Sequence, residues 1–469
     1  MGADLRSLAL FRIALGGVLL VDVFLRATDL VAHYTDAGVL PRADLIEVAE
    51  QPLWFSVHMG SGQWAFQAAL FLLAGLAATA LVLGWHTRWA SLISWFMLCS
   101  VQARNPMVLN SGDVLLRVLL LWGVFLPWGR LWSLDSRGQA PPRSLLVADA
   151  GTLAYTLQIV LLYLTAGLHK SGEAWRNGTA VYYALSIDQF TTPLGERLLH
   201  YPALMSALSY TVVAFQLSVP VLIFLPWKNG LFRTLAVLGT VSLHLGIASC
   251  MHLGIFSGVA TVAALGLLPS AVWPRPKIPL EGPPPPTLPR PASVVVALLM
   301  LLNLGWNLHN LWPRVPAPRF IPLLFRMDQH WGMFAPQPLS HDGWYVREGE
   351  LANGRVVDLT TGQDLVWDKP PHVADTYKNE RWRKYLMTLY ELRGSPHRAF
   401  YCRYLGRVWN QTHRGPWQVK VVKLWFMREL TLPDGATAPV EKVLMTRYVC
   451  VDDDEGGFEK LFGPYPYRR

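Results

Sequence analysis

Long apolar segments occupy the chain up to about residue 312, and shorter stretches that mix charged and aromatic residues follow. A helix needs roughly 20 mostly apolar residues to cross a bilayer. On that basis we predict nine spanning helices, of which the third, fourth and eighth are the least clear because they are short or contain charges. The predicted spans are 7–28, 63–83, 88–103, 113–127, 150–169, 203–226, 231–249, 253–271 and 292–312.

The first apolar segment is predicted to remain as a helix rather than to be removed as a signal peptide. Its apolar stretch is long, Asp22 and Arg26 interrupt its end, and no cleavage motif of small residues follows. Because Asp22 and Arg26 are four residues apart, they are expected to pair on one helix face.

Charges in the loops predict the orientation of the bundle. The loop 29–62 contains five acidic residues against the single basic residue Arg42, whereas alternate loops are basic. The N-terminus is therefore expected in the cytoplasm and the C-terminal domain on the opposite side. The basic residues of those alternate loops are Arg88, Arg130, Arg137, Arg143, Lys228, Arg233, Arg275, Lys277 and Arg290.

The pattern divides the chain into a transmembrane domain, 1–312, and a C-terminal domain, 313–469. A linker at 273–291 precedes the last span, and its four consecutive prolines, Pro283 to Pro286, exclude a helix there.

Alternating apolar and polar residues in the C-terminal domain predict strands, so the fold class is a helical membrane bundle with a β-rich α+β domain. Helical spacing of apolar residues predicts a helix nearby. The predicted elements are strands within 345–357 and 418–432, turns at Asn353–Gly354 and Pro433–Gly435, and a helix over Arg381–Leu389.

Composition agrees with a membrane protein. Charged residues make up 16% of the chain, against about 25% in soluble proteins. The net charge of +9 is spread over short loops and the C-terminal domain, and no nucleic-acid-binding motif accompanies it, so the expected partner is the lipid bilayer and not a nucleic acid. The sequence also has no nucleotide-binding, hydrolase, metalloprotease or kinase signature.

Lys170, at the end of the fifth predicted span, is the strongest candidate for catalysis because ionisable groups at membrane depth usually have a function. His169 and Glu173 lie within one helical turn of it. Partial removal from water would lower the lysine pKa and make the amine a base or nucleophile. Alternatively, Lys170 reaches the lipid headgroups and pairs with Glu173; the residues alone favour this second interpretation.

Two other groups of polar residues could line the same cavity. Arg104 and Asp113 could form a charge pair near Asn110, or the segment could be a tight connecting loop. His244 and His252 flank the junction of the seventh and eighth spans. Two histidines do not make a metal site, so we expect helix packing there and no metal.

Cys402 and Cys450 are the two cysteines of the C-terminal domain. If that domain is outside the cytoplasm, they could form a disulfide; the alternative is two buried thiols.

Several motifs resemble the HTTM family, the membrane proteins related to the vitamin K-dependent gamma-carboxylase. The resemblance covers most of the chain. The matching segments are Leu10–Gly16, Tyr34–Pro41, Arg104–Pro106, Asn110–Asp113, Trp132–Asp135, Ala166–Lys170 with Trp175 and Gly178, Trp331–Pro336 and Asp342–Tyr345.

This resemblance implies a bacterial inner-membrane protein in which Lys170 is the catalytic base. It also implies reduced vitamin K or another quinol as cofactor, and carboxylation of a peptide or protein substrate. One departure concerns the oxidation of the quinol: where the carboxylase has an Asn-His pair, this chain has Asn110-Ser111 and no histidine.

A non-catalytic alternative is a membrane assembly, transport or maturation factor that binds a partner through its C-terminal domain. It predicts an exposed aromatic patch on that domain. The alternative is that these aromatic side chains form the core of the domain and are buried. The aromatic residues concerned are Trp331, Phe334, Trp344 and Trp382.

Overall fold

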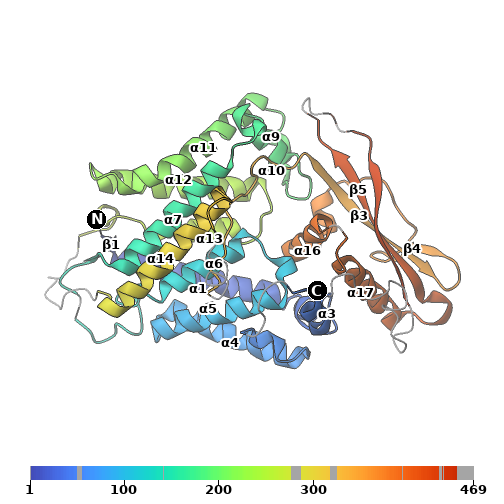
Figure 1. The fold of residues 1–469 in the computed structure, drawn as a ribbon, viewed down its shortest axis with the longest axis horizontal. Helices are drawn as coiled ribbons and strands as arrows, with labels where there is room; N and C mark the ends of the chain where they lie inside the picture. The colour runs from blue at the N-terminus through green and yellow to red at the C-terminus, as the bar shows by residue number, and fades with distance from the viewer. Residues whose placement is uncertain are drawn as a thin grey trace.

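The computed structural model describes residues 2–49, 55–140, 142–275, 287–316, 325–392, 394–432, 436 and 438–450. A helical bundle is followed by a domain in which helices α16 and α17 lie between the bundle and a sheet (Figure 1). The helices are α1 (Leu5–Ala27), α2 (Leu30–Tyr34), α3 (Arg42–Val48), α4 (Trp64–Leu83), α5 (Thr87–Arg104), α6 (Ser111–Gly123), α7 (Ala150–His169), α8 (Glu173–Arg176), α9 (Ala180–Leu185), α10 (Pro193–Leu198), α11 (Pro202–Phe224), α12 (Asn229–Cys250), α13 (Phe256–Leu265), α14 (Arg290–Leu311), α16 (Glu380–Glu391) and α17 (His397–Thr412). The strands are β1 (Ala3–Asp4), β2 (Leu146–Val147), β3 (His341–Leu351), β4 (Val356–Asp358), β5 (Val419–Leu430) and β6 (Glu441–Val449).

Each of the nine predicted spans coincides with a helix, but the count of nine spans is not confirmed. Among the described residues, six helices are long and apolar enough to cross a membrane: α1, α4, α7, α11, α12 and α14. The third, fourth and eighth predicted spans correspond to α5, α6 and α13. Helices α6 and α13 have only 13 and 10 residues, and most of them are buried against neighbouring helices, so they need not match the bilayer thickness.

The loops that the charge pattern separates into two sets gather at opposite ends of the bundle. At one end, β1 pairs with β2, the Arg233 guanidinium donates to the Gly2 carbonyl, and Arg6 donates to the Pro274 carbonyl. The C-terminal domain lies at the other end, next to α3 (Figure 1). Which end faces the cytoplasm stays a prediction, and Pro283 to Pro286 of the linker lie outside the described residues.

The C-terminal domain contains an antiparallel sheet of order β4-β3-β5-β6. In the long central pair, His341 lies opposite Leu430 and Glu350 opposite Val421. Helix α17 packs on β5 and β6. The strands predicted within 345–357 and 418–432 and the helix over Arg381–Leu389 are confirmed, whereas α17 and β6 were not predicted; Pro433–Gly435 lies outside the described residues.

The segment before the sheet belongs to the bundle rather than to the C-terminal domain. Met327 and Trp331 are buried in the bundle core. The Gln158 side chain donates to Gln329 and accepts from Asn303, with N–O distances of 2.8 Å in both bonds. These buried amides join α7, α14 and the segment 325–334, so this segment packs with the bundle.

The predicted exposed aromatic patch is wrong, and the alternative of core residues is correct. Trp331 and Trp344 are buried in the two cores, and Phe334 and Trp382 pack partly buried against core residues. These rings stabilise the fold by burial and are not displayed to a partner.

A buried carboxylate, Asp342 on β3, joins the sheet to the loop before α10. It accepts hydrogen bonds from the Gln189 side chain and backbone, at N–O distances of 2.9 and 3.2 Å. Burial and the neighbouring Asp188 carboxylate raise the pKa of Asp342 to about 7. Lys369 binds the Asp188 carboxylate at 2.6 Å, and Tyr377 also lies close to Asp342.

We expect this contact to weaken as pH rises. The folded protein holds a proton on Asp342 that the unfolded chain, with the ordinary pKa of 3.8, has already released, so stability falls as pH rises through this window and levels off above about 7. Asp342→Asn should reduce the loss of thermal stability between about pH 5 and pH 8. The exposed Asp364→Asn should leave it unchanged, and equal pH slopes for the wild type and Asp342→Asn would contradict the assignment.

Candidate functional site

Lys170 follows the last residue of α7 and is buried, with 8% of its surface exposed. Its ammonium nitrogen Nζ donates to the Ala166 carbonyl at 3.0 Å and lies 5.2 Å from the centre of the Trp175 ring. Burial lowers the pKa of Lys170 to about 8. Glu173 accepts instead from the Asn177 amide, so the predicted Lys170–Glu173 pair does not form.

The segment that leads into the C-terminal domain covers this lysine. The Trp175 indole donates to the Phe334 carbonyl, and the Gly172 N–H donates to the Pro336 carbonyl, each at 2.8 Å. A side chain at Gly172 would collide with Pro336, because its Cβ would lie 2.6 Å from the Pro336 carbonyl oxygen. These two bonds tie the turn after Lys170 to the segment 334–336.

His169 points to a different neighbour. Its ring centre lies 4.9 Å from that of His330. His244 lies deeper in the bundle, where its Nε2 is 2.8 Å from the Tyr163 hydroxyl. No group of three or more metal-ligating side chains occurs among the described residues.

The predicted pair between Arg104 and Asp113 is wrong, because each has other partners. The Arg104 guanidinium donates to the carbonyls of Leu40 and Thr35 at 2.8 and 3.0 Å, and lies 3.6 Å from the Asp36 carboxylate. Arg104 therefore fixes the loop after α2.

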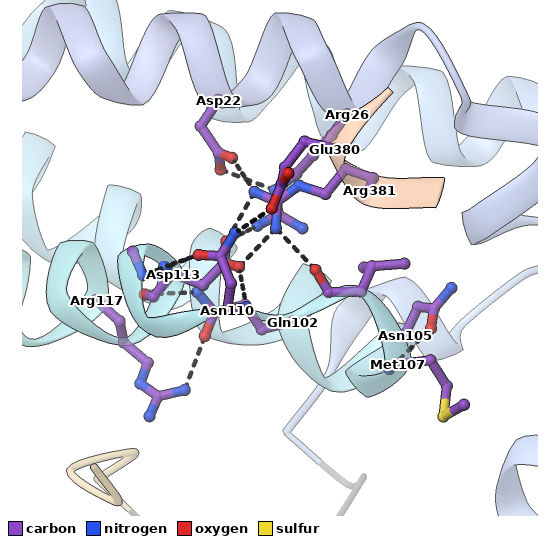
Figure 2. A network of polar contacts seen from close by, with 12 residues as sticks. Asp22, Arg26, Gln102, Asn105, Met107, Asn110, Asp113, Arg117, Glu380 and Arg381 are labelled. Atoms are coloured by element: carbon purple, nitrogen blue, oxygen red, sulfur yellow. Dashed lines mark hydrogen bonds and ion pairs between the residues drawn. The ribbon is translucent and has the colours of Figure 1, made fainter. Parts of the chain in front are cut away.

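Asp113 instead belongs to a buried cluster of four charges (Figure 2). Arg26 donates to Asp22 at 2.8 Å, confirming that predicted pair, and also binds Asp113. Arg381, from α16 of the C-terminal domain, binds Asp22 at 2.6 Å and Asp113 at 2.5 Å, and donates to the Val108 carbonyl at 2.9 Å. All four charged side chains have 6% or less of their surface exposed.

Local structure fixes both sides of this cluster. Asn110 caps α6, and the Asp113 carboxylate accepts from the Asn110 N–H at 2.7 Å. Asn379 caps α16 and places Arg381 in its first turn. Lys378 and Asn379 both bind the Asp29 carboxylate at 2.5 Å, which adds a second clamp between the two domains.

The charges of the cluster balance, with two carboxylates and two guanidinium groups. Burial and the neighbouring Arg26 favour the neutral form of Arg381, but Asp113 and Asp22 outweigh them and raise the pKa of Arg381. Removal of one charge would leave an unpaired buried ion, which typically costs about 3–5 kcal/mol.

A cleft of about 370 Å³ opens beside this cluster. Bundle residues after α12, including His252 and Ser257, form one wall, and the C-terminal residues Asp375, Glu380 and Arg383 form the other. The Asn110 amide donates to the Glu380 carboxylate at 3.4 Å, which links the start of α6 to a wall of the cleft. Of the residues singled out from the sequence, Asn110 and Asp113 thus bind side chains of the C-terminal domain, and His252 lines the cleft, which Lys170 does not line.

A second, apolar cavity of about 20 Å³ lies between α1, α4 and α5. Pockets for small molecules are typically about 300–1,000 Å³, so this cavity is too small for a quinol, and Lys170 lines neither cavity. Neither cavity therefore fits a quinol within reach of Lys170, and we derive no step through that cofactor.

Glu380, Arg381 and Arg383 were not singled out from the sequence as site residues. The available signal was their position: three charges at the start of a predicted helix, after the helix-capping Asn379. Asp113, which binds Arg381, and Asn110, which binds Glu380, lie more than 260 residues away in the sequence.

Cys402 is a buried thiol in the structure, and the neighbouring Cys450 sulfur adds to burial in raising its pKa. The Cys402–Cys450 disulfide stays a prediction.

Arg381→Met should detach the C-terminal domain from the bundle, because Asp22 and Asp113 would share one guanidinium. We expect a loss of about 3–5 kcal/mol in stability and faster proteolysis of the segment before α16. The additional change Asp22→Asn, which restores charge balance, should recover part of the loss.

The control is Arg355→Met, which removes a half-exposed partner of Asp364 in the same domain. It should change stability by less than about 1 kcal/mol. Equal effects of the Arg381 and Arg355 substitutions would show that the cluster does not hold the domains together.

Comparison with known proteins supports the membrane assignment. A family model for the HTTM domain matches residues 2–273, which covers α1 to α13 but neither α14 nor the C-terminal domain. The sporulation-delaying protein SdpB of Bacillus subtilis (strain 168) is 25% identical over 218 residues, an alignment that covers 45% of this chain and 65% of that relative. No solved structure matches the chain. Because the family match covers more than half of the sequence, this protein belongs to the HTTM domain family.

Proposed function

We propose that the protein is an integral membrane enzyme in which Lys170 is a general base. The observation that carries the proposal is a buried lysine whose pKa is lowered to about 8 by burial. Its described contacts are a carbonyl and an aromatic ring, and neither is a negatively charged group that would hold the proton on the amine.

The neighbours of Lys170 suit this role. A neutral amine still donates to the Ala166 carbonyl, so loss of one proton keeps the amine in place. With 8% of its surface exposed, Lys170 has little contact with water. A base with a pKa near the working pH combines a sizeable neutral fraction with adequate strength.

The finer form of the proposal follows from the resemblance to the vitamin K-dependent gamma-carboxylase. In that form, a lipid-soluble quinol would be the cofactor, and a peptide or protein would be the substrate that is carboxylated. It also includes a location in the bacterial inner membrane, with the N-terminus in the cytoplasm and Lys170 near the outer face. The support for this form is the set of shared motifs, and the absence of a histidine after Asn110 counts against the quinol step.

A second candidate function is a non-catalytic maturation or assembly factor. The cleft between the bundle and the C-terminal domain favours it, because this cleft is far larger than the apolar cavity and Lys170 does not line it. In this alternative, the C-terminal domain holds a partner and Lys170 only stabilises the end of α7.

Lys170→Ala should abolish catalysis, with a rate loss of about 10²–10⁴-fold, as for removal of a general base. The assay is oxidation of a quinol by the purified protein in detergent, with oxygen, bicarbonate and a glutamyl peptide. The wild-type rate should rise with pH and level off above about 8, since only the neutral amine accepts a proton.

The matched control is Lys228→Ala, because the Lys228 ammonium group also lies over a tryptophan, 4.9 Å from the ring of Trp227. This lysine lies between α11 and α12, and its substitution should leave the rate unchanged. A Lys170→Ala variant that turns over like the wild type would remove Lys170 from the mechanism and leave the second candidate function.

A further inference from the structure

Two residues that line the cleft between the two domains have buried polar atoms without hydrogen-bond partners in the part of the chain that the structure describes. Arg383 has 4% of its surface exposed. Its Nε and Nη2 atoms bind the Glu380 carboxylate, and its guanidinium carbon lies 4.2 Å from the centre of the Phe190 ring. Its remaining nitrogen, Nη1, has no hydrogen-bond partner within the part of the chain that the structure describes.

Ser257, on the opposite wall, repeats this pattern. It has 6% of its surface exposed, and its hydroxyl also lacks a partner among the described residues. A buried donor without a partner is energetically unfavourable. Two such groups lining one cleft, one from each domain, indicate that a bound molecule supplies the missing acceptors.

The charged residues that line the cleft indicate which other group the bound molecule carries. Arg383 and Ser257 are buried, whereas Asp375 is exposed at the cleft, and Glu380 is only partly buried. A ligand that reaches the buried donors with an acceptor oxygen therefore passes carboxylates nearer to solvent. A simple anion would be repelled there, but an ammonium group on the same ligand would be attracted.

We propose that this cleft binds a small zwitterion, either a free amino acid or a short peptide. Its carboxylate accepts from Arg383 Nη1 and from the Ser257 hydroxyl, and its ammonium group faces Asp375. The volume of about 370 Å³ is at the lower end of the range for small-molecule sites. The inference goes beyond the proposed function, because Lys170 does not line the cleft.

The test is isothermal titration calorimetry on the full chain in detergent with three glycylglycine probes that differ in their terminal groups. Glycylglycine has both charges, glycylglycinamide lacks the carboxylate, and N-acetylglycylglycine lacks the ammonium group. We expect glycylglycine to bind, the amide to bind at least tenfold more weakly, and the acetylated probe to bind more weakly as well. Comparison of the affinities for glycine and glycylglycine distinguishes a free amino acid from a peptide as the ligand.

Ser257→Ala is the decisive variant, because removal of a hydroxyl without a partner should not destabilise the fold. Its midpoint of thermal unfolding should match that of the wild type, while its affinity for the better-bound zwitterion falls about threefold to tenfold. The control is Ser249→Ala, where the lost hydroxyl is exposed and donates to the Leu245 carbonyl. That variant should bind the zwitterion like the wild type.

Arg383→Gln should abolish binding, and its thermal unfolding shows whether the loss of the Glu380 pair has disturbed the domain. Lys170→Ala should bind the zwitterion normally, which separates this inference from the proposed catalytic role. Absence of binding for both glycylglycine and glycine would overturn the proposal. So would equal affinity for glycylglycine and glycylglycinamide, or unchanged affinity in Ser257→Ala.

Discussion

The structure depends on a buried cluster of four charged side chains at the place where α1 and α6 contact α16. Asp22, Arg26 and Asp113 come from the helical bundle and carry one negative charge in excess; Arg381 from the C-terminal domain balances it. Since an unpaired ion is unfavourable at a buried position, the bundle and the C-terminal domain cannot separate without exposing the cluster to water or leaving it unbalanced. The docking of these two parts in turn creates the polar cleft beside Glu380.

Several of the family-like motifs stabilise the fold, and this reduces the number of candidate catalytic residues. Arg12 donates to four backbone carbonyls, among them that of Leu81 at the end of α4. Asp135 accepts from the N–H groups of His86 and Thr87 at the start of α5, and Arg104 holds the loop after α2. Lys170 is different. Its side chain donates to the Ala166 carbonyl of its own helix and does not fix a loop, and its burial lowers the pKa of the amine.

The helices of the bundle could be predicted from the sequence because apolar length is a local property, as in 7–28 and 150–169. The positions of α6 and α13 inside the bundle could not, because burial of a short apolar helix depends on its neighbours. Helix α17 has a weak apolar pattern, and only one residue of β6 is buried, so neither gives a clear local signal. The role of Arg381 was also hidden, since its acidic partners lie 268 and 359 residues away. For the same reason the cover over Lys170, which comes from Phe334 and Pro336, could not be foreseen.

Hydrogen exchange of α16 in the intact protein tests most directly whether the charge cluster joins the two domains. The first turn of this helix carries Arg381, and Tyr385, Leu386 and Leu389 are buried. If the cluster holds α16 against the bundle, the backbone amides of Glu380–Glu391 should exchange as slowly as those of the buried part of α1. Rapid exchange of α16, at the rate of the exposed turn 352–355, while α1 stays protected, would contradict the account.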